Sequence, residues 1–128
     1  MGVSANNPAE DDTQAVFEGV ARYCGLLSEP MRVRILHSIC HEEKSVSQIV
    51  TETGASQTNV SRHLNTLYSA DVLTRRKRGN FVYYQVKDHG LTEICRMVCT
   101  NVIASSDAHS DLDDQAMELA RAFQGANI

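Results

Sequence analysis

The sequence contains no tryptophan and only 5% aromatic residues, so a buried core must be built mainly from aliphatic side chains. No apolar run approaches the roughly 20 residues that cross a bilayer as a helix. The N-terminal residues lack the basic start and the apolar stretch of a secretory signal. These absences lead us to expect a cytoplasmic protein with no membrane partner, and a chain of 128 residues suits one domain.

The residue patterns of common enzymes are also missing. The sequence shows no phosphate-binding glycine loop, no paired acids and no nucleophile–base arrangement, so we do not expect an enzyme. Four cysteines occur, but none form the Cys-x-x-Cys pair of a zinc ribbon or a thioredoxin-type centre. In a cytoplasmic protein these cysteines are not expected to form structural disulfides.

Charge is distributed unevenly along the chain. The formal net charge of −4 alone argues against nucleic acid as a partner. Residues 56–87, however, carry six cationic side chains and one carboxylate, a net charge of +5, which leaves −9 for the remainder. Positive charge gathered in one segment is the electrostatic footprint of a nucleic-acid-binding surface. The simpler alternative is a solvated cationic hairpin that resists pairing with other sheets.

Apolar residues recur at helical spacing through most of the chain. They predict a first helix that begins near Asp12 or Thr13 and a second that begins at Pro30. A third helix is expected after Ser47 as its cap, and Asp88 is the expected cap of the helix that follows the cationic segment. The spacing therefore predicts a mainly helical protein.

The predicted division of the chain has three parts. Residues 1–11 are polar and acidic, and we expect them to be flexible. Residues 12–106 are expected to form the domain for DNA binding and dimerisation. Residues 107–128 are expected to form a C-terminal amphipathic helix.

The segment from Gly54 to Tyr68 has the pattern of a helix-turn-helix. Gly54 can adopt the left-handed conformation that ends one helix, and Ser56 can cap the next. The predicted buried stripe of that next helix consists of Val60, Leu64, Leu67 and Tyr68. A short glycine turn between two helices, the second polar at its start, is typical of this DNA-binding motif.

Two runs rich in β-formers follow, over 72–77 and 81–86, and Gly79-Asn80 joins them into a predicted hairpin. The expected fold is therefore mainly α with a β-hairpin wing, a winged helix-turn-helix in the order α-α-α-α-β-β-α-α. Its first and last helices carry apolar stripes broader than a small domain can bury alone. We therefore expect a homodimer through the first and the last helices, which would match two half-sites on DNA.

The helix after Ser56 and the wing supply the residues that we expect to contact double-stranded operator DNA. Polar side chains at a helix start can reach base edges in a major groove, and a cationic hairpin can lie along phosphates. The predicted DNA-binding residues are Ser56, Gln57, Thr58, Asn59, Ser61, Arg62, His63, Arg76, Lys77, Arg78 and Asn80. The rival interpretation is a winged helix that binds protein, which predicts no salt-dependent affinity for DNA.

The sequence also resembles a known family, the ArsR/SmtB winged-helix repressors of bacteria. The resemblance is carried by LSEPMRVRIL, SVSQIV and SQTNVSRHLNTLYSADVLTRRKRGNFVYYQV, and it extends from Tyr23 to Cys99. It implies a homodimer that represses an operator and is released when an inducer binds. Many members of this family sense metal ions or metalloids, and others sense reactive sulfur species or oxidants through cysteines.

The inducer sites that the resemblance implies match this sequence only in part. One family metal site uses a Cys-x-Cys motif before the turn, where this chain has no cysteine. A zinc-type site on the fifth helix begins with Asp and His, as Asp88 and His89 do, but its downstream His and Glu are missing. Persulfide-sensing members pair a cysteine of the second helix with one of the fifth. Here His37 holds the second-helix position, and Cys40 follows three residues later.

The cysteines are the candidate sensing residues. Cys95 and Cys99 are four residues apart on one predicted helix, so their side chains share a face about 6 Å apart at Cβ. Such a pair suits a soft metal or metalloid ion, As(III) or Cd(II), with Cys24 or Cys40 as a further ligand. The same four thiols suit reversible oxidation or sulfur sensing, whereas the metal set is predicted as Cys95, Cys99 and Cys24. The alternative is that the cysteines only fill the core and the inducer acts elsewhere.

Overall fold

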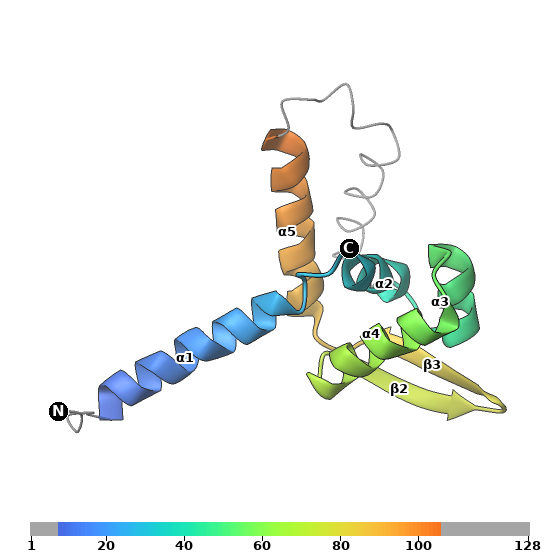
Figure 1. Ribbon diagram of the computed structural model, residues 1–128, viewed down its shortest axis with the longest axis horizontal. Coiled ribbons are helices and arrows are strands. Elements are labelled where there is room, and N and C mark those ends of the chain that lie inside the picture. Colours follow the sequence, from blue (N-terminus) through green and yellow to red (C-terminus); the bar gives the residue numbers. More distant parts are fainter. Residues whose placement is uncertain (1–7, 106–128) are drawn as a thin grey trace.

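The computed structural model describes residues 8–105, which form five helices and a three-stranded sheet (Figure 1). In chain order the elements are α1 (Pro8–Gly25), α2 (Pro30–Ile39), β1 (Lys44–Ser45), α3 (Val46–Thr53), α4 (Gln57–Ser69), β2 (Leu73–Arg78), β3 (Phe81–Val86) and α5 (His89–Ser105). This order confirms the mainly α winged helix-turn-helix with a hairpin wing. None of these helices is long and apolar enough to cross a membrane. The predicted helix over 107–128 and most of the predicted flexible N-terminus lie outside the described residues.

Two of the predicted helix starts are wrong. α1 begins at Pro8 rather than near Asp12, because proline suits a first helical turn and the acidic residues after it favour a helix N-terminus. α3 is capped by Ser45 rather than Ser47. The Ser45 hydroxyl accepts a hydrogen bond from the Gln48 backbone N–H at 3.2 Å, and the Gln48 side chain accepts one from the Ser45 N–H at 2.8 Å. This capping box satisfies two donors at once.

The sheet is antiparallel and has the order β1-β3-β2. β3 has its predicted span, whereas β2 begins and ends one residue later than the predicted run over 72–77. Gly79, with φ 64°, supplies the left-handed backbone of the hairpin turn. The sequence does not predict β1, because two residues are too few to show an alternating pattern, and only the folded chain brings them beside β3.

The core lies between the helix-turn-helix, the sheet and the start of α5, and it is aliphatic as predicted. Its fully buried residues are Ile35, Leu36, Ile39, Ile49, Val60, Leu64, Leu67 and Leu91. Burying one such side chain stabilises the fold by about 1.5–3 kcal/mol. The shared core therefore fixes α4 relative to α2, α3 and the wing.

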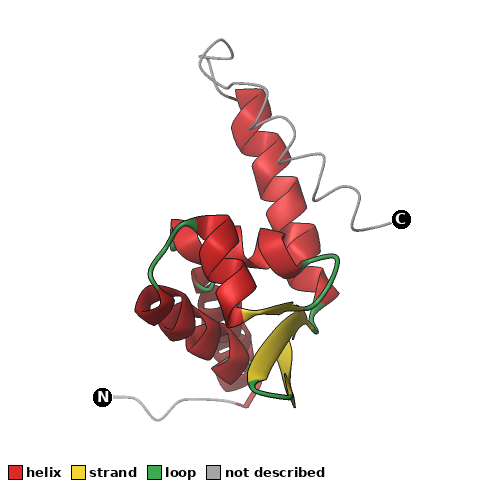
Figure 2. Cartoon of the chain, turned by 90° about the vertical axis from the view of Figure 1, so that its right-hand side faces the viewer, coloured by secondary structure: helices red, strands yellow, loops and turns green. Residues whose placement is uncertain are grey.

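Figure 1 shows that α1 and α5 both extend away from this core, and Figure 2 shows the same for α5 from a second side. A hydrogen bond joins the two helices: the Tyr23 hydroxyl donates to the Asp88 carboxylate at 2.8 Å. Burial, together with the neighbouring Asp88 carboxylate, raises the pKa of Tyr23 to about 12. The hydroxyl therefore keeps its proton at neutral pH and remains the donor that anchors α1 to the start of α5.

Candidate nucleic-acid interface

Both ends of the turn before α4 are fixed by local signals. Gly54 ends α3 with φ 73°, the predicted left-handed conformation. The Ser56 hydroxyl accepts a hydrogen bond from the Asn59 backbone N–H at 3.1 Å and caps α4, as predicted. Loss of such a cap typically costs about 0.5–2 kcal/mol of stability, so the start of α4 is firmly placed.

One side of α4 faces the core, but its buried stripe is shorter than predicted. Val60, Leu64 and Leu67 are fully buried, whereas Tyr68 is 38% exposed. Tyr68 lies at the edge between α4 and the wing, where the Arg75 guanidinium stands 4.2 Å from the centre of its ring. This cation–π contact holds the first arginine of the wing beside α4.

The outer side of α4 forms a shallow polar surface open to solvent. The residues that line it are Gln57, Thr58, Ser61, Arg62, Asn65, Thr66 and Ser69. The structure thus brings together the first four, which are predicted DNA-binding residues. The last three are absent from the prediction, although they continue the helical spacing of Ser61 and Arg62 along the same face.

Asn59 and His63, two predicted DNA-binding residues near Arg62, lie in different environments. Arg62 donates a hydrogen bond to Asn59 Oδ1, so Asn59 orients the guanidinium. His63 is only 5% exposed, and its Nδ1 lies 3.5 Å from Arg32 Nη1 of α2. Burial and the charges of Arg62 and Arg32 lower the pKa of His63, so its ring is neutral at pH 7. The structure thus places His63 against α2 rather than on the outer surface of α4, and its contact with DNA stays a prediction.

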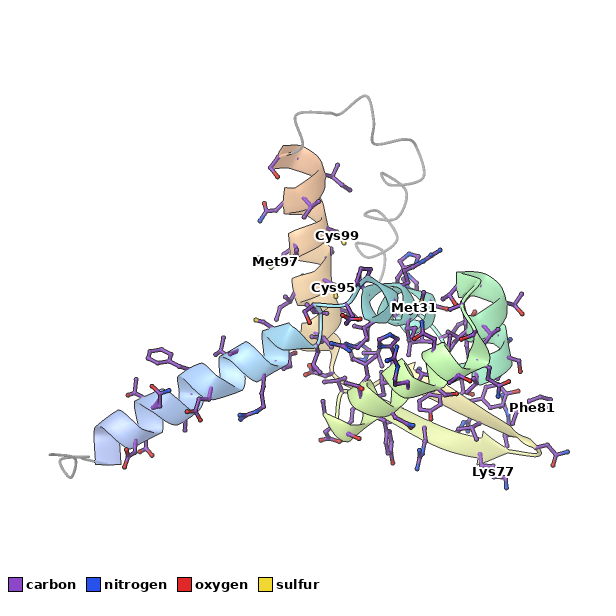
Figure 3. All side chains as sticks on the ribbon, in the orientation of Figure 1. Met31, Lys77, Phe81, Cys95, Met97 and Cys99 are labelled. Atoms are coloured by element: carbon purple, nitrogen blue, oxygen red, sulfur yellow. The ribbon has the colours of Figure 1, made fainter. Side chains whose placement is uncertain are left out.

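The wing divides its cations between two faces, because side chains alternate along β2. Arg75 and Lys77 share the face that continues from buried Leu73, and Arg76 and Arg78 lie on the other. Figure 3 shows Lys77 projecting from the edge of the wing. Within residues 8–105, Lys77 makes no hydrogen bond or ion pair, so its charge is open to a phosphate.

The cations on the second face of the wing, Arg76 and Arg78, interact with the Glu43 carboxylate, which the prediction did not include. Arg76 donates to the Glu43 carboxylate through Nε at 2.9 Å and also through Nη2. Arg78 Nη2 lies 3.5 Å from the same carboxylate. Glu43 is in the loop between α2 and β1, 33 residues before Arg76, so no local spacing could have indicated this pairing.

Three of the four cysteines gather where the end of α2 meets α5. Cys40 is the C-cap of α2 and is buried, as is Cys95, whereas Cys99 is half-buried. Figure 3 shows Cys95 and Cys99 on the side of α5 that faces α2. Burial and the neighbouring thiols of Cys99 and Cys40 raise the pKa of Cys95 to about 12. Burial also raises the pKa of Cys40 and of Cys99, so all three are protonated at neutral pH.

The fourth cysteine, Cys24, has an exposed side chain on α1. Within residues 8–105, no three His, Cys, Asp or Glu side chains are arranged to hold a metal ion. The predicted metal ligands Cys95, Cys99 and Cys24 therefore do not form a complete site inside one protomer. A site that two protomers share stays a prediction.

Comparison with known proteins agrees with this arrangement. Residues 29–75 match the sequence model of the family described as bacterial regulatory protein, arsR family. The chain is 34% identical over 70 residues to the cadmium resistance transcriptional regulatory protein CadC of Listeria innocua, a match that covers 54% of this chain and 59% of CadC.

Two solved structures extend the likeness to the whole winged helix. The homodimeric winged helix-turn-helix DNA-binding domain of Mb0332 from Mycobacterium bovis is 25% identical with a TM-score of 0.63, over 88% of this chain and 97% of that one. The transcriptional repressor PagR of Bacillus anthracis is 26% identical with a TM-score of 0.58, over 66% and 98%. Residues 29–75 carry a helix-turn-helix of the ArsR family. The chain is thus a DNA-binding transcriptional regulator of the ArsR type rather than an enzyme.

Asp88, at the start of α5, has a structural role. Both carboxylate oxygens of Asp88 are engaged, Oδ2 by the Tyr23 hydroxyl and Oδ1 by the Gly90 backbone N–H at 3.0 Å. Asp88 is thus the helix cap that the sequence predicts, and it also anchors α1. This role agrees with the missing downstream ligands of the zinc-type site.

α1 and α5, which extend away from the core, also expose apolar side chains. These residues, between 50% and 63% exposed, are Val16, Phe17 and Val20 of α1 and Met97, Val98 and Val102 of α5. Figure 3 shows Met97 on the side of α5 opposite Cys95 and Cys99. Apolar surface of this kind marks an interaction site. α1 is the first of the two helices through which the sequence predicts a homodimer, and the other, over 107–128, lies outside the described residues.

Proposed function

We propose that this protein is a homodimeric repressor that binds operator DNA through α4 and the wing. The polar outer surface of α4 is the observation that carries this proposal, because its side chains present donors and acceptors that suit base edges in a major groove. The proposed base readers are Gln57, Thr58, Ser61 and Arg62. The proposed contacts to the DNA backbone are Ser56, Asn59, Arg76, Lys77, Arg78 and Asn80.

Two copies of this surface must act together on DNA. A two-fold dimer that buries the apolar faces of α1 and α5 would place two α4 helices on the same side of the assembly. Regulators of this type bind half-sites about one helical turn, or a multiple of it, apart. Dimerisation therefore sets the distance between the two reading helices, and anything that changes the dimer changes operator affinity.

We further propose that an inducer acts on the thiols of Cys40, Cys95 and Cys99. Cys40 caps α2, which packs against both helices of the helix-turn-helix, while Cys95 and Cys99 belong to the helix with the proposed dimer face. A change in these thiols therefore acts where the two parts pack together. Adding atoms to a well-packed core typically costs about 1–3 kcal/mol. A coupling free energy of about 1–3 kcal/mol is enough to change DNA affinity about 5- to 150-fold.

Covalent chemistry at this junction starts from the thiolate, which is the minor form of these cysteines at neutral pH. A peroxide can take two electrons and two protons from two thiols, which forms one disulfide and two water molecules. In a polysulfide, a thiolate can instead attack a sulfane sulfur, so that one S–S bond breaks, a persulfide forms on the cysteine and the polysulfide leaves one sulfur atom shorter. Because Cys40 and Cys95 are buried and Cys99 is half-buried, Cys99 is the proposed first point of attack.

We expect peroxide or polysulfide to change the mass of the full-length protein and to release it from DNA. Mass spectrometry should show a loss of about 2 Da for a disulfide, or a gain of about 32 Da for each added sulfur atom. The raised thiol pKa values make the reaction slow at pH 7, and its rate should rise about tenfold per pH unit up to pH 9. Cys24→Ser should be released from DNA like the native protein, because Cys24 lies on α1 and outside the junction of Cys40, Cys95 and Cys99.

Two outcomes would count against the thiol proposal. One is release of a folded Cys95→Ser/Cys99→Ser variant by the same reagents at native concentrations, which places the inducer elsewhere. The other is an As(III) or Cd(II) ion retained in the mass spectrum while peroxide and polysulfide have no effect on DNA binding. That result would favour a metal site completed between protomers.

A further inference from the structure

Glu43 forms ion pairs with Arg76 and Arg78, two of the arginines that we propose to contact DNA. Its carboxylate accepts a hydrogen bond from Arg76 Nε at 2.9 Å and a second one from Arg76 Nη2. It also forms an ion pair with Arg78, whose Nη2 lies 3.5 Å away. The Arg78 guanidinium also lies 4.3 Å from the centre of the Tyr83 ring. Both guanidinium groups thus already have partners within the protein.

Within this cluster of Glu43, Arg76 and Arg78, the carboxylate lies deeper than the two guanidinium groups. The Glu43 side chain is 22% exposed, whereas those of Arg76 and Arg78 are 60% and 57% exposed. A phosphate that approaches from outside meets the guanidinium groups first. Two of the N–H donors of Arg76 are already engaged by Glu43, so the phosphate has to compete with the carboxylate for them.

The negative charge of Glu43 is permanent under the conditions in which DNA is bound. Hydrogen bonds from Arg76, together with the charges of Arg76 and Arg78, hold the pKa of Glu43 below its usual range. A hollow of about 560 Å³ beside the pair, with His41, Thr74 and Gln85 among its lining residues, leaves room for the carboxylate to move aside. The pair can therefore open without disturbing the core.

We propose that Glu43 is a competitor built into the fold, which withholds Arg76 and Arg78 from the DNA backbone until phosphates displace it. Arg75 and Lys77, on the other face of β2, then carry the wing's first contacts, because no carboxylate in the described part of the chain pairs with them. The native wing binds DNA more weakly, and with less sensitivity to salt, than its number of cations implies. This inference rests on the proposed contact between the wing and DNA.

The test compares charge-neutral variants of two adjacent acids in the full-length protein. Glu43→Gln removes the competing charge and keeps the size of the side chain. Glu42→Gln is the matched control, because it removes the same charge from the next residue, which lines the same hollow but has no bond to the wing. Affinity for a fluorescent double-stranded operator is measured over a series of salt concentrations, and thermal melting confirms that each variant folds.

We expect Glu43→Gln to bind DNA about 3- to 10-fold more tightly, because two cations regain phosphate partners. The slope of log affinity against log salt should steepen by about 1–2, since each phosphate neutralised contributes about 0.9. Glu42→Gln should change affinity by less than about twofold, as rim charges without a partner do. Adding Arg76→Gln and Arg78→Gln to Glu43→Gln should abolish the gain.

The alternative outcomes separate this inference from the proposed function. If Glu43→Gln binds no better than native protein while Arg76→Gln and Arg78→Gln weaken binding, the wing contacts DNA but the competitor role is wrong. An equal gain in Glu42→Gln also overturns it, because general charge then explains the effect. If none of the wing variants alters affinity or salt slope, both the inference and the proposed wing contact fail.

Discussion

Arg62→Ala should weaken operator binding by about 10- to 100-fold while the protein remains folded. Arg62 is exposed within the polar surface of α4, and Asn59 holds its guanidinium in place. A side chain that reads a base edge is worth about 1–3 kcal/mol of discrimination. Because the side chain is not part of the core, thermal stability should change little. The measurement is operator affinity by fluorescence anisotropy at fixed salt.

The control for this prediction is Arg34→Ala. It removes the same exposed cation from α2, away from the outer surface of α4. A general loss of positive charge would weaken binding equally in both variants, whereas a contact made by Arg62 affects only one of them. Equal losses would therefore show that α4 does not read DNA through Arg62. A loss for Arg62→Ala on random as well as operator DNA would reassign the residue to backbone contacts.

Val98→Glu should convert the homodimer to monomers and reduce operator binding by about 100-fold or more. Val98 is half exposed on α5 among apolar side chains that the proposed dimer buries. A two-fold axis would bring two added carboxylates into the same apolar interface, where unpaired charges are costly. The monomer keeps its winged helix but loses the second half-site. Sedimentation velocity and operator affinity measure the two effects.

Thr100→Glu provides the control on the same helix. Thr100 is exposed, and helical geometry places it on the side of α5 nearly opposite Val98. It should therefore leave both the dimer and operator affinity close to native. A Val98→Glu protein that still sediments as a dimer would show that this face of α5 is not the interface.

The elements with strong local signals were predicted well from the sequence. β3 was predicted without error, and α4 was predicted with its cap at Ser56 and its turn at Gly54. These features depend on residues within a few positions of one another. The polar outer surface of α4 follows from the same short-range periodicity, which is why four of its residues were in the predicted site.

His63 shows how residue type can outweigh spacing in such a prediction. It lies three residues after Val60 and four before Leu67, both fully buried, so helical spacing assigns it to the inner face. Its polarity suggested a DNA contact instead. The structure resolves this conflict with Arg32, which meets the imidazole and also donates to the Leu26 carbonyl at 2.8 Å.

The features that sequence reasoning missed depend on contacts between distant residues. Strand β1 and the Glu43–Arg76 pair join segments far apart in the chain, and the proximity of Cys40 to Cys95 was only one of the alternatives that the sequence left open. Periodicity within a segment carries no information about such neighbours. These are also the features that bear on control of DNA binding, because they link α2 to the wing and to α5.

In the proposed function, a dimer of this chain reads two half-sites through α4. Selection of the native full-length protein on a random pool of double-stranded DNA, followed by footprinting of the enriched sequence, tests it most directly. We expect two inverted half-sites with centres about 10–10.5 base pairs, or a multiple of that, apart, bound by two chains and lost with Arg62→Ala. A single unrepeated site bound by one chain, or no enrichment over random sequence, would contradict it.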